Sequence, residues 1–340
     1  MNTLNEAYKA HPITLGDIIP IDFSSSPSLP DSHSWSEPVH DDDDDFSATS
    51  SIPIIDLKDP NAQKLIALAC ENWGAFHLKN HGIPLDVTEE AEQELQRLFS
   101  LPAEQKMKAL RSPDSASGYG NARISPFFSK AMWYEGFTII GGSSSHDAKK
   151  IWPHDYQTFC DRMEKYEKQM RSIADRLTDM MMEVLGISEE KRKWVGASDV
   201  STALQLNFYP CCPEPNRAMG LAPHTDTSIF TILHAKSSGL QIFKEGKWIH
   251  VHPHPNALIV HTGDFTRIMS NARFCSPLHR VVPNQDTERY SMAYFYSPPT
   301  DYVISPSDLN SVARFRDVTV KEYIGIKSQK FADSLSFIST

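Results

Sequence analysis

Seven short β-rich segments dominate the sequence after residue 200. Branched and aromatic residues are frequent in each segment, and Pro, Gly, Asn or Asp separates one segment from the next. Many short strands at fairly regular spacing are typical of a β-sandwich or a barrel. We therefore predict a mainly β core with flanking helices, and strands at 202–209, 229–234, 240–244, 247–251, 256–261, 278–282 and 289–297.

The chain before this β-rich part has helical periodicity. A short apolar strand is expected at 52–57. The segment 61–73 that follows has apolar residues at helical spacing. We expect its buried face to comprise Leu65, Leu68 and Ala69.

Three more helices and one strand complete the predicted elements. The strand is expected at 75–79, and a helix follows at 85–99. The most regular segment is 156–185, where apolar residues recur at alternating spacings of four and three, as in a long amphipathic helix. A last helix is predicted over 319–337.

These patterns divide the chain into four parts. Residues 1–50 are rich in Ser, Pro and Asp without a sustained apolar period, so we expect a mostly flexible N-terminal arm. Residues 51–200 are expected to form a helix-rich N-terminal region that packs on the core. The core itself spans 201–300, and 301–340 forms a C-terminal segment and helix.

Composition excludes several classes of function. The formal net charge of −10 and the lack of a Lys/Arg cluster argue against a nucleic-acid partner. No apolar run is long enough to cross a membrane. The 5 cysteines are odd in number and form no C-x-x-C pair, which suggests neither a disulfide framework nor a zinc ribbon. We expect a cytoplasmic protein, monomeric by default, that acts on a small molecule.

Three residues are candidates for binding a metal ion. His224 and Asp226 are two positions apart and precede a strand-like run, and His279 lies in a later one. Residues i and i+2 of a strand face the same way. Two histidines and one carboxylate suit non-haem Fe(II) and leave positions open for a cosubstrate and dioxygen. On spacing alone, a buried, hydrogen-bonded His–Asp pair is an equally good interpretation.

A second pair of residues offers a binding site for a carboxylate. Arg289 and Ser291 are also two positions apart, and a guanidinium fork binds a carboxylate through two hydrogen bonds. 2-Oxoglutarate could chelate iron with its keto-acid end while its other carboxylate reaches this pair. Tyr209 could add a hydroxyl. The alternative for the pair is a surface ion pair.

The alternating histidines His250, His252 and His254 are the other candidate metal site. Alternating histidines on a strand can bind zinc or copper. No carboxylate or cysteine accompanies them, so we interpret them as surface polar positions.

An ordered set of motifs resembles the plant 2-oxoglutarate- and Fe(II)-dependent dioxygenases. The matching segments are Asn207–Pro210, Gly220–Asp226, Gly239–Gln241, Gly263–Asp264, His279–Val281 and Arg289–Ser291. The resemblance implies a double-stranded β-helix, or jelly-roll, core over 201–300, backed by helices. It also implies that His224, Asp226 and His279 hold Fe(II), that Arg289, Ser291 and Tyr209 bind 2-oxoglutarate, and that no catalytic residue is needed beyond the iron centre.

Further segments resemble the gibberellin 3-oxidases in particular. They are His11–Ile13, Leu29–Trp35, Trp73–Phe76, Asn80–Pro84, Ser117–Gly120, Ala122–Ile124, Met132–Thr138, Leu204–Asn207 and Cys212–Gly220. The resemblance implies 3β-hydroxylation of a C19 gibberellin, release of succinate and carbon dioxide, and ascorbate as a reductant for iron. The alternatives are a gibberellin 2-oxidase, a dual C2/C3 hydroxylase and, from another class, a non-catalytic gibberellin-binding or interaction module.

Gibberellins are rigid, mostly apolar acids, so the substrate pocket should combine an apolar wall with a cationic anchor. Aromatic and apolar residues between 127 and 137 could supply the wall, and a nearby cation the anchor. The candidates are Phe127, Phe128, Met132, Trp133 and Phe137 for the wall, and Arg123 or Lys130 for the anchor. Ordinary core packing and a solvated charge are the respective alternatives.

Two residues depart from the family pattern. His261 stands where asparagine is usual, and this histidine could lie near the iron. Ala272 stands where glycine is typical, and it would be strained if its turn requires a positive φ. The segment between Pro306 and Val318 also looks shorter than in related enzymes. These departures leave iron chemistry intact and put C3 regiospecificity in doubt.

Overall fold

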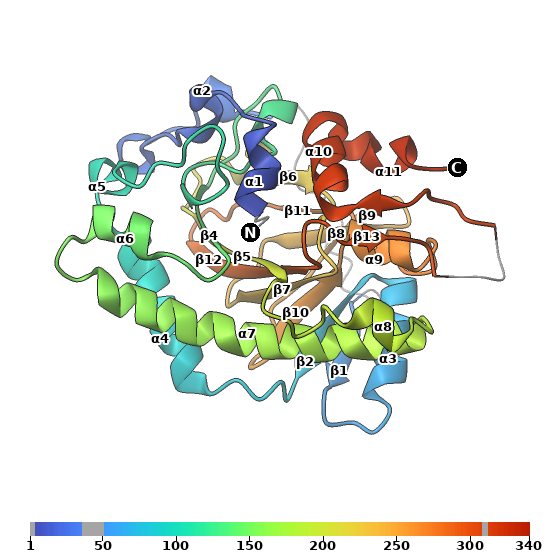
Figure 1. Ribbon diagram of the computed structural model, residues 1–340. Coiled ribbons are helices and arrows are strands. Elements are labelled where there is room, and N and C mark those ends of the chain that lie inside the picture. The colour runs from blue at the N-terminus through green and yellow to red at the C-terminus, as the bar shows by residue number, and fades with distance from the viewer. Residues whose placement is uncertain (1–3, 36–50, 308–311) are drawn as a thin grey trace.

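Two facing β-sheets form the centre of the protein in the computed structural model, which describes residues 4–35, 51–307 and 312–340. The larger sheet has the strand order β1-β2-β10-β7-β12-β5-β4-β3, and the smaller has the order β6-β11-β8-β9. Apolar residues of both sheets, among them Ala222, Ile242, Leu233 and Ile259, pack in one cluster. The arrangement is the jelly-roll core of this fold class, flanked by helices (Figure 1).

The predicted strands of the core are present within two residues of their expected bounds. They are β5 (Ser201–Tyr209), β7 (Phe230–Ala235), β8 (Leu240–Lys244), β9 (Lys247–His250), β10 (Leu258–Thr262), β11 (His279–Val281) and β12 (Arg289–Ser297). The prediction omitted β6 (Leu221–His224), β3 (Gly118–Tyr119) and β4 (Glu135–Ile140). Near the C-terminus, β13 (Val303–Ile304) pairs with β14 (Val318–Thr319).

Helices of the N-terminal half cover the outer face of the large sheet. The long helix α7 (Tyr156–Val184) packs against β7 and β12, and α4 (Leu85–Phe99) packs against α7. Figure 1 shows α7 running beneath the sheets, on the side opposite α10. The predicted apolar spacing therefore places the buried side of α7 on the sheet. The strands β1 (Ile54–Asp56) and β2 (Ala75–Lys79) extend the same sheet at its edge.

The buried face of α3 (Ala62–Asn72) differs from the prediction. The helix buries Ala62, Ile66, Ala69 and Cys70, whereas Leu65 and Leu68 are 38% and 43% exposed. Because α3 packs against both α7 and β2, its orientation is set by these neighbours. Leucine spacing alone therefore selected the wrong side of the helix.

The N-terminal segment also differs from the expected flexible arm. Residues 4–35 lie against the body of the protein and include α1 (Leu4–Lys9) and α2 (Leu15–Ile18). Ala7 and Ile18 are buried, and α1 packs against α10. These contacts join residues far apart in the sequence, so no local period of apolar residues could predict them. The aspartate run and the rest of 36–50 lie outside the described residues.

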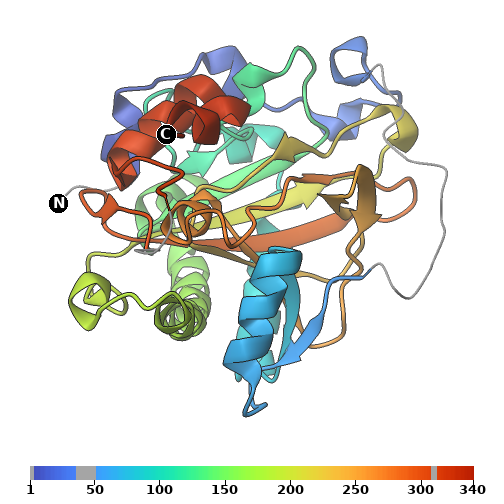
Figure 2. The same ribbon diagram turned by 90° about the vertical axis from the view of Figure 1, so that its right-hand side faces the viewer.

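The C-terminal helix is interrupted. The segment predicted as one helix consists of α10 (Val320–Lys330), a short turn and α11 (Ser334–Phe337). Thr319 and Glu322 form a capping box at the start of α10, and Phe331 ends it with a φ of +47°. Figure 2 shows α10 and α11 beside the N-terminal helices, over one end of the sheets. No helix in the described part of the chain has both the length and the apolar character needed to cross a bilayer.

Ala272 has the positive φ that the missing glycine suggested. Its φ is +67°, it lies in the turn that follows α9 (Asp264–Met269), and its amide N–H donates to Arg267 O at 2.8 Å. A left-handed conformation costs an L-residue with a Cβ atom about 1 kcal/mol or more.

We expect Ala272→Gly to raise the free energy of unfolding by about 0.5 to 1 kcal/mol, because glycine removes this strain. Urea unfolding would measure the change. Ala257→Gly is the matched control, because Ala257 is a half-buried loop alanine without a positive φ, and this change should destabilise. A loss of stability in Ala272→Gly would show instead that packing of the methyl group outweighs the strain.

Candidate metal centre and cosubstrate cavity

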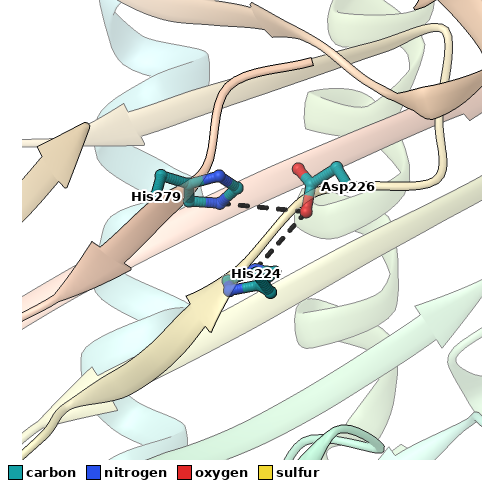
Figure 3. A group of neighbouring side chains, drawn as sticks. All are labelled: His224, Asp226 and His279. Atoms are coloured by element: carbon teal, nitrogen blue, oxygen red, sulfur yellow. Dashed lines mark ion pairs between the residues drawn. The ribbon is translucent and has the colours of Figure 1, made fainter. Parts of the chain in front are cut away.

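Three potential metal ligands meet between the two sheets. One ligand atom each from His224, Asp226 and His279 lies within 4.8 Å of the other two. Nε2 of His224 and Nε2 of His279 lie 3.4 Å and 3.8 Å from Asp226 Oδ1. Figure 3 shows both imidazoles directed toward the carboxylate. The structure thus brings together the three residues that the spacing singled out.

Local backbone structure positions the cluster. His279 opens β11 and pairs with His224 at the end of β6. Asp226 lies in the loop just beyond β6, not on a strand with His224 as expected. Its carbonyl accepts from Asp264 N at 2.7 Å. A Cβ at Gly263 would lie 2.2 Å from Ser228 O, so only glycine allows this loop to approach so closely.

The two imidazoles are prepared to accept a cation. Nδ1 of His224 lies 2.8 Å from Ala222 O, and Nδ1 of His279 lies 3.2 Å from Pro277 O. These contacts favour a proton on Nδ1 and leave the Nε2 lone pair for a metal. Burial lowers the pKa of His279 well below its usual value. The donor set therefore fits a divalent iron ion.

The carboxylate of Asp226 is held ionised. Burial would raise its pKa, but the neighbouring imidazoles, His279 foremost, hold the pKa of Asp226 well below its usual value. Thr231 Oγ1 donates to Oδ2 at 2.5 Å, while Oδ1 faces the two histidines. One oxygen is thus tied to the protein and the other is directed into the cluster.

His261 lies beside the cluster, as the sequence suggested. Its Nδ1 is 3.5 Å from Asp226 Oδ2 without forming a hydrogen bond, and its ring centroid is 4.6 Å from that of His279. Burial lowers its pKa. His261 is therefore a third imidazole beside the three predicted metal ligands.

The cluster opens into a cavity of about 280 Å³ that also contains the predicted cosubstrate residues. Arg289 is paired with Tyr209 across β12 and β5, and Ser291 is paired with Asn207. Arg289 Nη1 donates to Ser291 Oγ at 3.1 Å, and the guanidinium lies 5.0 Å from the ring centre of Tyr209. Arg289 Nε is buried without a partner. A carboxylate placed here would satisfy it.

A glycine makes room for this arginine. A Cβ at Gly239 would lie 2.9 Å from Arg289 Cδ and 2.8 Å from Val282 O, and the φ of Gly239 is +138°. Any side chain would therefore displace Arg289 or the strand beside it.

Helix α10 is tied to the metal loop through a buried carboxylate. Asp264 accepts from Ser276 Oγ at 2.7 Å, Tyr323 OH at 2.9 Å and Lys327 Nζ at 2.7 Å. Lys327 Nζ also donates to Thr225 Oγ1 at 2.6 Å, and Thr225 lies between two of the predicted metal ligands in sequence. The C-terminal helix therefore forms a fixed wall of the cavity.

The predicted substrate residues divide in two. Arg123 and Phe127 line the cavity. Lys130 and Phe128 are not among its lining residues, and Lys130 Nζ donates to Asp31 O at 2.7 Å. The structure therefore does not place Lys130 where it could anchor a substrate in this cavity.

The remaining three aromatic and apolar candidates belong to the core. Trp133 packs edge-on against Phe23, with ring centroids 4.8 Å apart. Phe137 packs against Phe159 of α7, with ring centroids 6.1 Å apart. Met132 is buried as well. None of the three lines the cavity. The density of aromatic residues could not distinguish core from pocket, because the burial of these side chains is decided by contacts with distant residues such as Phe23 and Phe159.

Sequence reasoning missed other cavity residues. Arg111, Tyr8, Ile324, Lys327 and Phe331 all line it. Tyr8 and the α10 residues come from the two ends of the chain, so only folding brings them to the core. Arg111 stands in no recognisable ligand spacing.

Comparisons with known proteins identify the family. The 2OG-Fe(II) oxygenase superfamily model matches residues 201–298, and the model of the N-terminal region of non-haem dioxygenases in morphine synthesis matches 52–155. Gibberellin 3-beta-dioxygenase 1 of Pisum sativum is 46% identical, over 99% of this chain and 94% of its own length. The chain belongs to the gibberellin 3-beta-dioxygenase family. Gibberellin 3-beta-dioxygenase 1 of Arabidopsis thaliana is 42% identical over 98% of this chain and 97% of its own.

Solved structures share the fold of this chain. The crystal structure of JOX2 in complex with 2OG, Fe and JA superposes with a TM-score of 0.79 and 28% identity, covering 94% of this chain and 98% of that one. A dioxygenase for auxin oxidation in rice shares the fold, with a TM-score of 0.69. This dioxygenase uses Fe(II) and 2-oxoglutarate, as the sequence predicted.

Proposed function

We propose that this dioxygenase hydroxylates a gibberellin at C3, converting a C19 precursor to the 3β-hydroxylated product while 2-oxoglutarate is converted to succinate and carbon dioxide. One observation carries the proposal. A His–Asp–His cluster and a buried, partly unsatisfied arginine share one cavity in a chain 46% identical to a gibberellin 3-beta-dioxygenase over nearly its full length.

We assign the site residues as follows. His224, Asp226 and His279 would hold Fe(II), and Arg289, Ser291 and Tyr209 would bind the distal carboxylate of 2-oxoglutarate. The iron supplies the oxidising chemistry, in which one oxygen atom of dioxygen enters the substrate and the other enters succinate. The geometry of the cluster and the unsatisfied Arg289 Nε support these roles.

The protein's own contribution is to bind, orient and exclude water. Apolar residues dominate the cavity wall, which includes Ile124, Leu221, Phe295, Ile324 and Phe331. Such a wall suits a rigid hydrocarbon skeleton. Because the reaction would take place at the bound iron, the carbon held nearest to it would be hydroxylated, so substrate position would decide between C3 and C2. No protein acid or base is needed in this proposal.

We further propose a monomer that acts in the cytoplasm without a nucleic-acid or membrane partner. The free state of the five cysteines supports a reducing compartment. We take 201–300 as the reacting core, with 51–200 and 301–340 as its supporting layers. The match of the superfamily model to 201–298 supports that boundary.

Reconstitution tests the proposal. Purified protein is loaded anaerobically with Fe(II) and 2-oxoglutarate, ascorbate is added, and the mixture is exposed to oxygen with a panel of C19 and C20 gibberellins. We expect a 3β-hydroxylated product and one succinate per product by mass spectrometry.

Each other outcome points to a different alternative. A 2-hydroxylated product would reassign the enzyme as a gibberellin 2-oxidase, and a mixture as a dual hydroxylase. Iron and 2-oxoglutarate binding without turnover of any gibberellin would contradict the hormone assignment and leave the family assignment intact. Failure to bind Fe(II) would favour a non-catalytic binding module.

A further inference from the structure

Four cationic side chains line the cavity, and three of them have an evident role. Lys327 is neutralised by Asp264, with Nζ 2.7 Å from Oδ2. Arg289 is the proposed 2-oxoglutarate ligand. Arg123 donates to Ser115 O at 2.8 Å and to His11 O at 2.5 Å, and its guanidinium stacks on Tyr8 at 4.5 Å. The fourth cation is Arg111.

Arg111 is a buried charge without a counterion. The residue is 4% exposed, and its Nε has no hydrogen-bond partner. Its Nη2 donates to Asn121 O. No carboxylate of the described residues lies within 4 Å of its guanidinium, which is absent from every ion pair of the structure. An unpaired buried charge is costly, and one retained at a cavity wall indicates a missing anion.

The electrostatic surroundings of Arg111 also favour the binding of an anion. Burial, and to a smaller extent the nearby Arg123, lower the pKa of Arg111 to about 10. The side chain therefore stays charged at neutral pH. Two guanidinium groups so close together produce a positive potential at this part of the cavity, and burial also lowers the pKa of Arg123.

Arg111 is held by a rigid backbone. Its amide N–H donates to Tyr119 O at 2.9 Å, and Tyr119 N donates to Ala109 O at 2.8 Å. A Cβ at Gly118 would lie 2.7 Å from Ala109 O, and the φ of Gly118 is +107°. The tight packing of these two segments fixes the base of the arginine, so little conformational entropy is lost when a ligand binds.

Apolar groups surround the cationic part of the cavity. The rings of Phe127 and Phe331 stack with their centroids 4.7 Å apart. Ile124, Ile324 and Leu4 line the same cavity. An apolar enclosure with a guanidinium in its wall matches a molecule that is mostly hydrocarbon with one carboxylate. A neutral apolar ligand would leave the arginine unsatisfied.

We propose that Arg111 binds the carboxylate of the substrate, with Arg123 adding positive charge and bracing the adjoining segments. The inference deepens the proposed function, on which it rests, because it makes the free carboxylic acid the required substrate form. It also moves the anchor from Arg123 and Lys130, the residues expected from the sequence, to Arg111.

The test compares a gibberellin free acid with its methyl ester, which keeps the skeleton and removes the charge. Turnover is measured by mass spectrometry. Binding is measured separately by calorimetry under nitrogen on protein loaded with Fe(II) and 2-oxoglutarate. The wild-type enzyme should prefer the acid over the ester by about thirtyfold or more in kcat/KM and in affinity, as expected for loss of a charge-assisted hydrogen-bonded pair.

Arg111→Met should raise the KM for the acid by a similar factor, leave the KM for the ester nearly unchanged, and thereby abolish the preference. Arg111→Lys should restore part of it, because the charge remains and the fork is lost. Arg273→Met is the matched control, since Arg273 is half exposed and paired with Glu71 outside the cavity. Both affinities should be unchanged in the control.

Several outcomes would overturn the inference. One is that the wild-type enzyme has the same kcat/KM and the same affinity for the acid and the ester. This comparison does not depend on whether the Arg111 variants fold. Another is an Arg111→Met variant whose 2-oxoglutarate affinity falls while its acid preference remains, which would make Arg111 a cosubstrate ligand. Lack of gibberellin turnover contradicts the proposed function instead, and the binding comparison then still decides whether Arg111 recognises the acid.

Discussion

Replacing His279 by alanine is expected to abolish Fe(II) binding and all hydroxylation. His279 supplies one of only two imidazoles in the cluster, and its Nε2 lies 3.8 Å from Asp226 Oδ1. Loss of an outer partner of a metal ligand already costs about ten- to a hundredfold in metal affinity or activity. Loss of a ligand itself should exceed that range. Metal analysis after anaerobic loading and desalting would measure bound iron directly.

The control for this experiment is His252→Ala, which removes an exposed histidine outside the cavity. Iron content and turnover should be those of the wild-type enzyme. Near-normal iron binding by His279→Ala, with the fold verified by circular dichroism, would exclude His279 as a ligand. The neighbouring His261 would then be the first candidate to replace it, because its ring lies 4.6 Å from that of His279.

Arg289→Met is expected to raise the KM for 2-oxoglutarate by about a hundredfold or more. The side chain is 1% exposed, its Nε is unsatisfied, and it faces Tyr209 and Ser291 in the cavity. Truncating one partner of a buried, hydrogen-bonded charge pair costs roughly 2 to 5 kcal/mol. Fe(II) affinity should remain within a fewfold of the wild-type value, since the arginine does not belong to the metal cluster.

Initial rates at varied 2-oxoglutarate concentration, together with anaerobic iron titration, separate the two effects. Arg289→Lys should recover part of the affinity by keeping the charge without the fork. Unchanged 2-oxoglutarate kinetics in Arg289→Met would contradict the assignment and direct attention to Arg111, the other arginine in the cavity with an unsatisfied Nε.

The core strands could be predicted because their signals are local. Strands β5 and β12 show alternating or continuous apolar residues between turn residues, and their predicted and observed bounds agree within a residue or two. The same locality made His224 and Asp226 recognisable as a pair. The loop position of Asp226 was not predictable, because it depends on the contact between its carbonyl and Asp264 N.

The predictions that failed concern contacts between distant segments. Helix α3 has two apolar sides, and only packing against α7 and β2 decides which is buried. Residues 4–35 lack a helical period, and their order comes from contacts such as the packing of α1 on α10. Trp133 and Phe137 are aromatic, as residues of a pocket wall often are, but both are buried in the core and do not line the cavity.

By itself, the sequence predicted the three candidate iron ligands and the arginine–serine pair, whose side chains the fold brings to one cavity, and it predicted the family, which the comparisons confirm. The sequence also raised the condition that Ala272 would be strained if its turn required a positive φ, and its φ in the structure is +67°. Only the tertiary structure decided which cations face the cavity. Arg111, Arg123 and Lys130 lie within twenty residues of one another, yet backbone carbonyls engage Arg123, Lys130 lies outside the cavity, and Arg111 is left buried without a counterion. That difference arises from burial and long-range contacts, which no local pattern encodes.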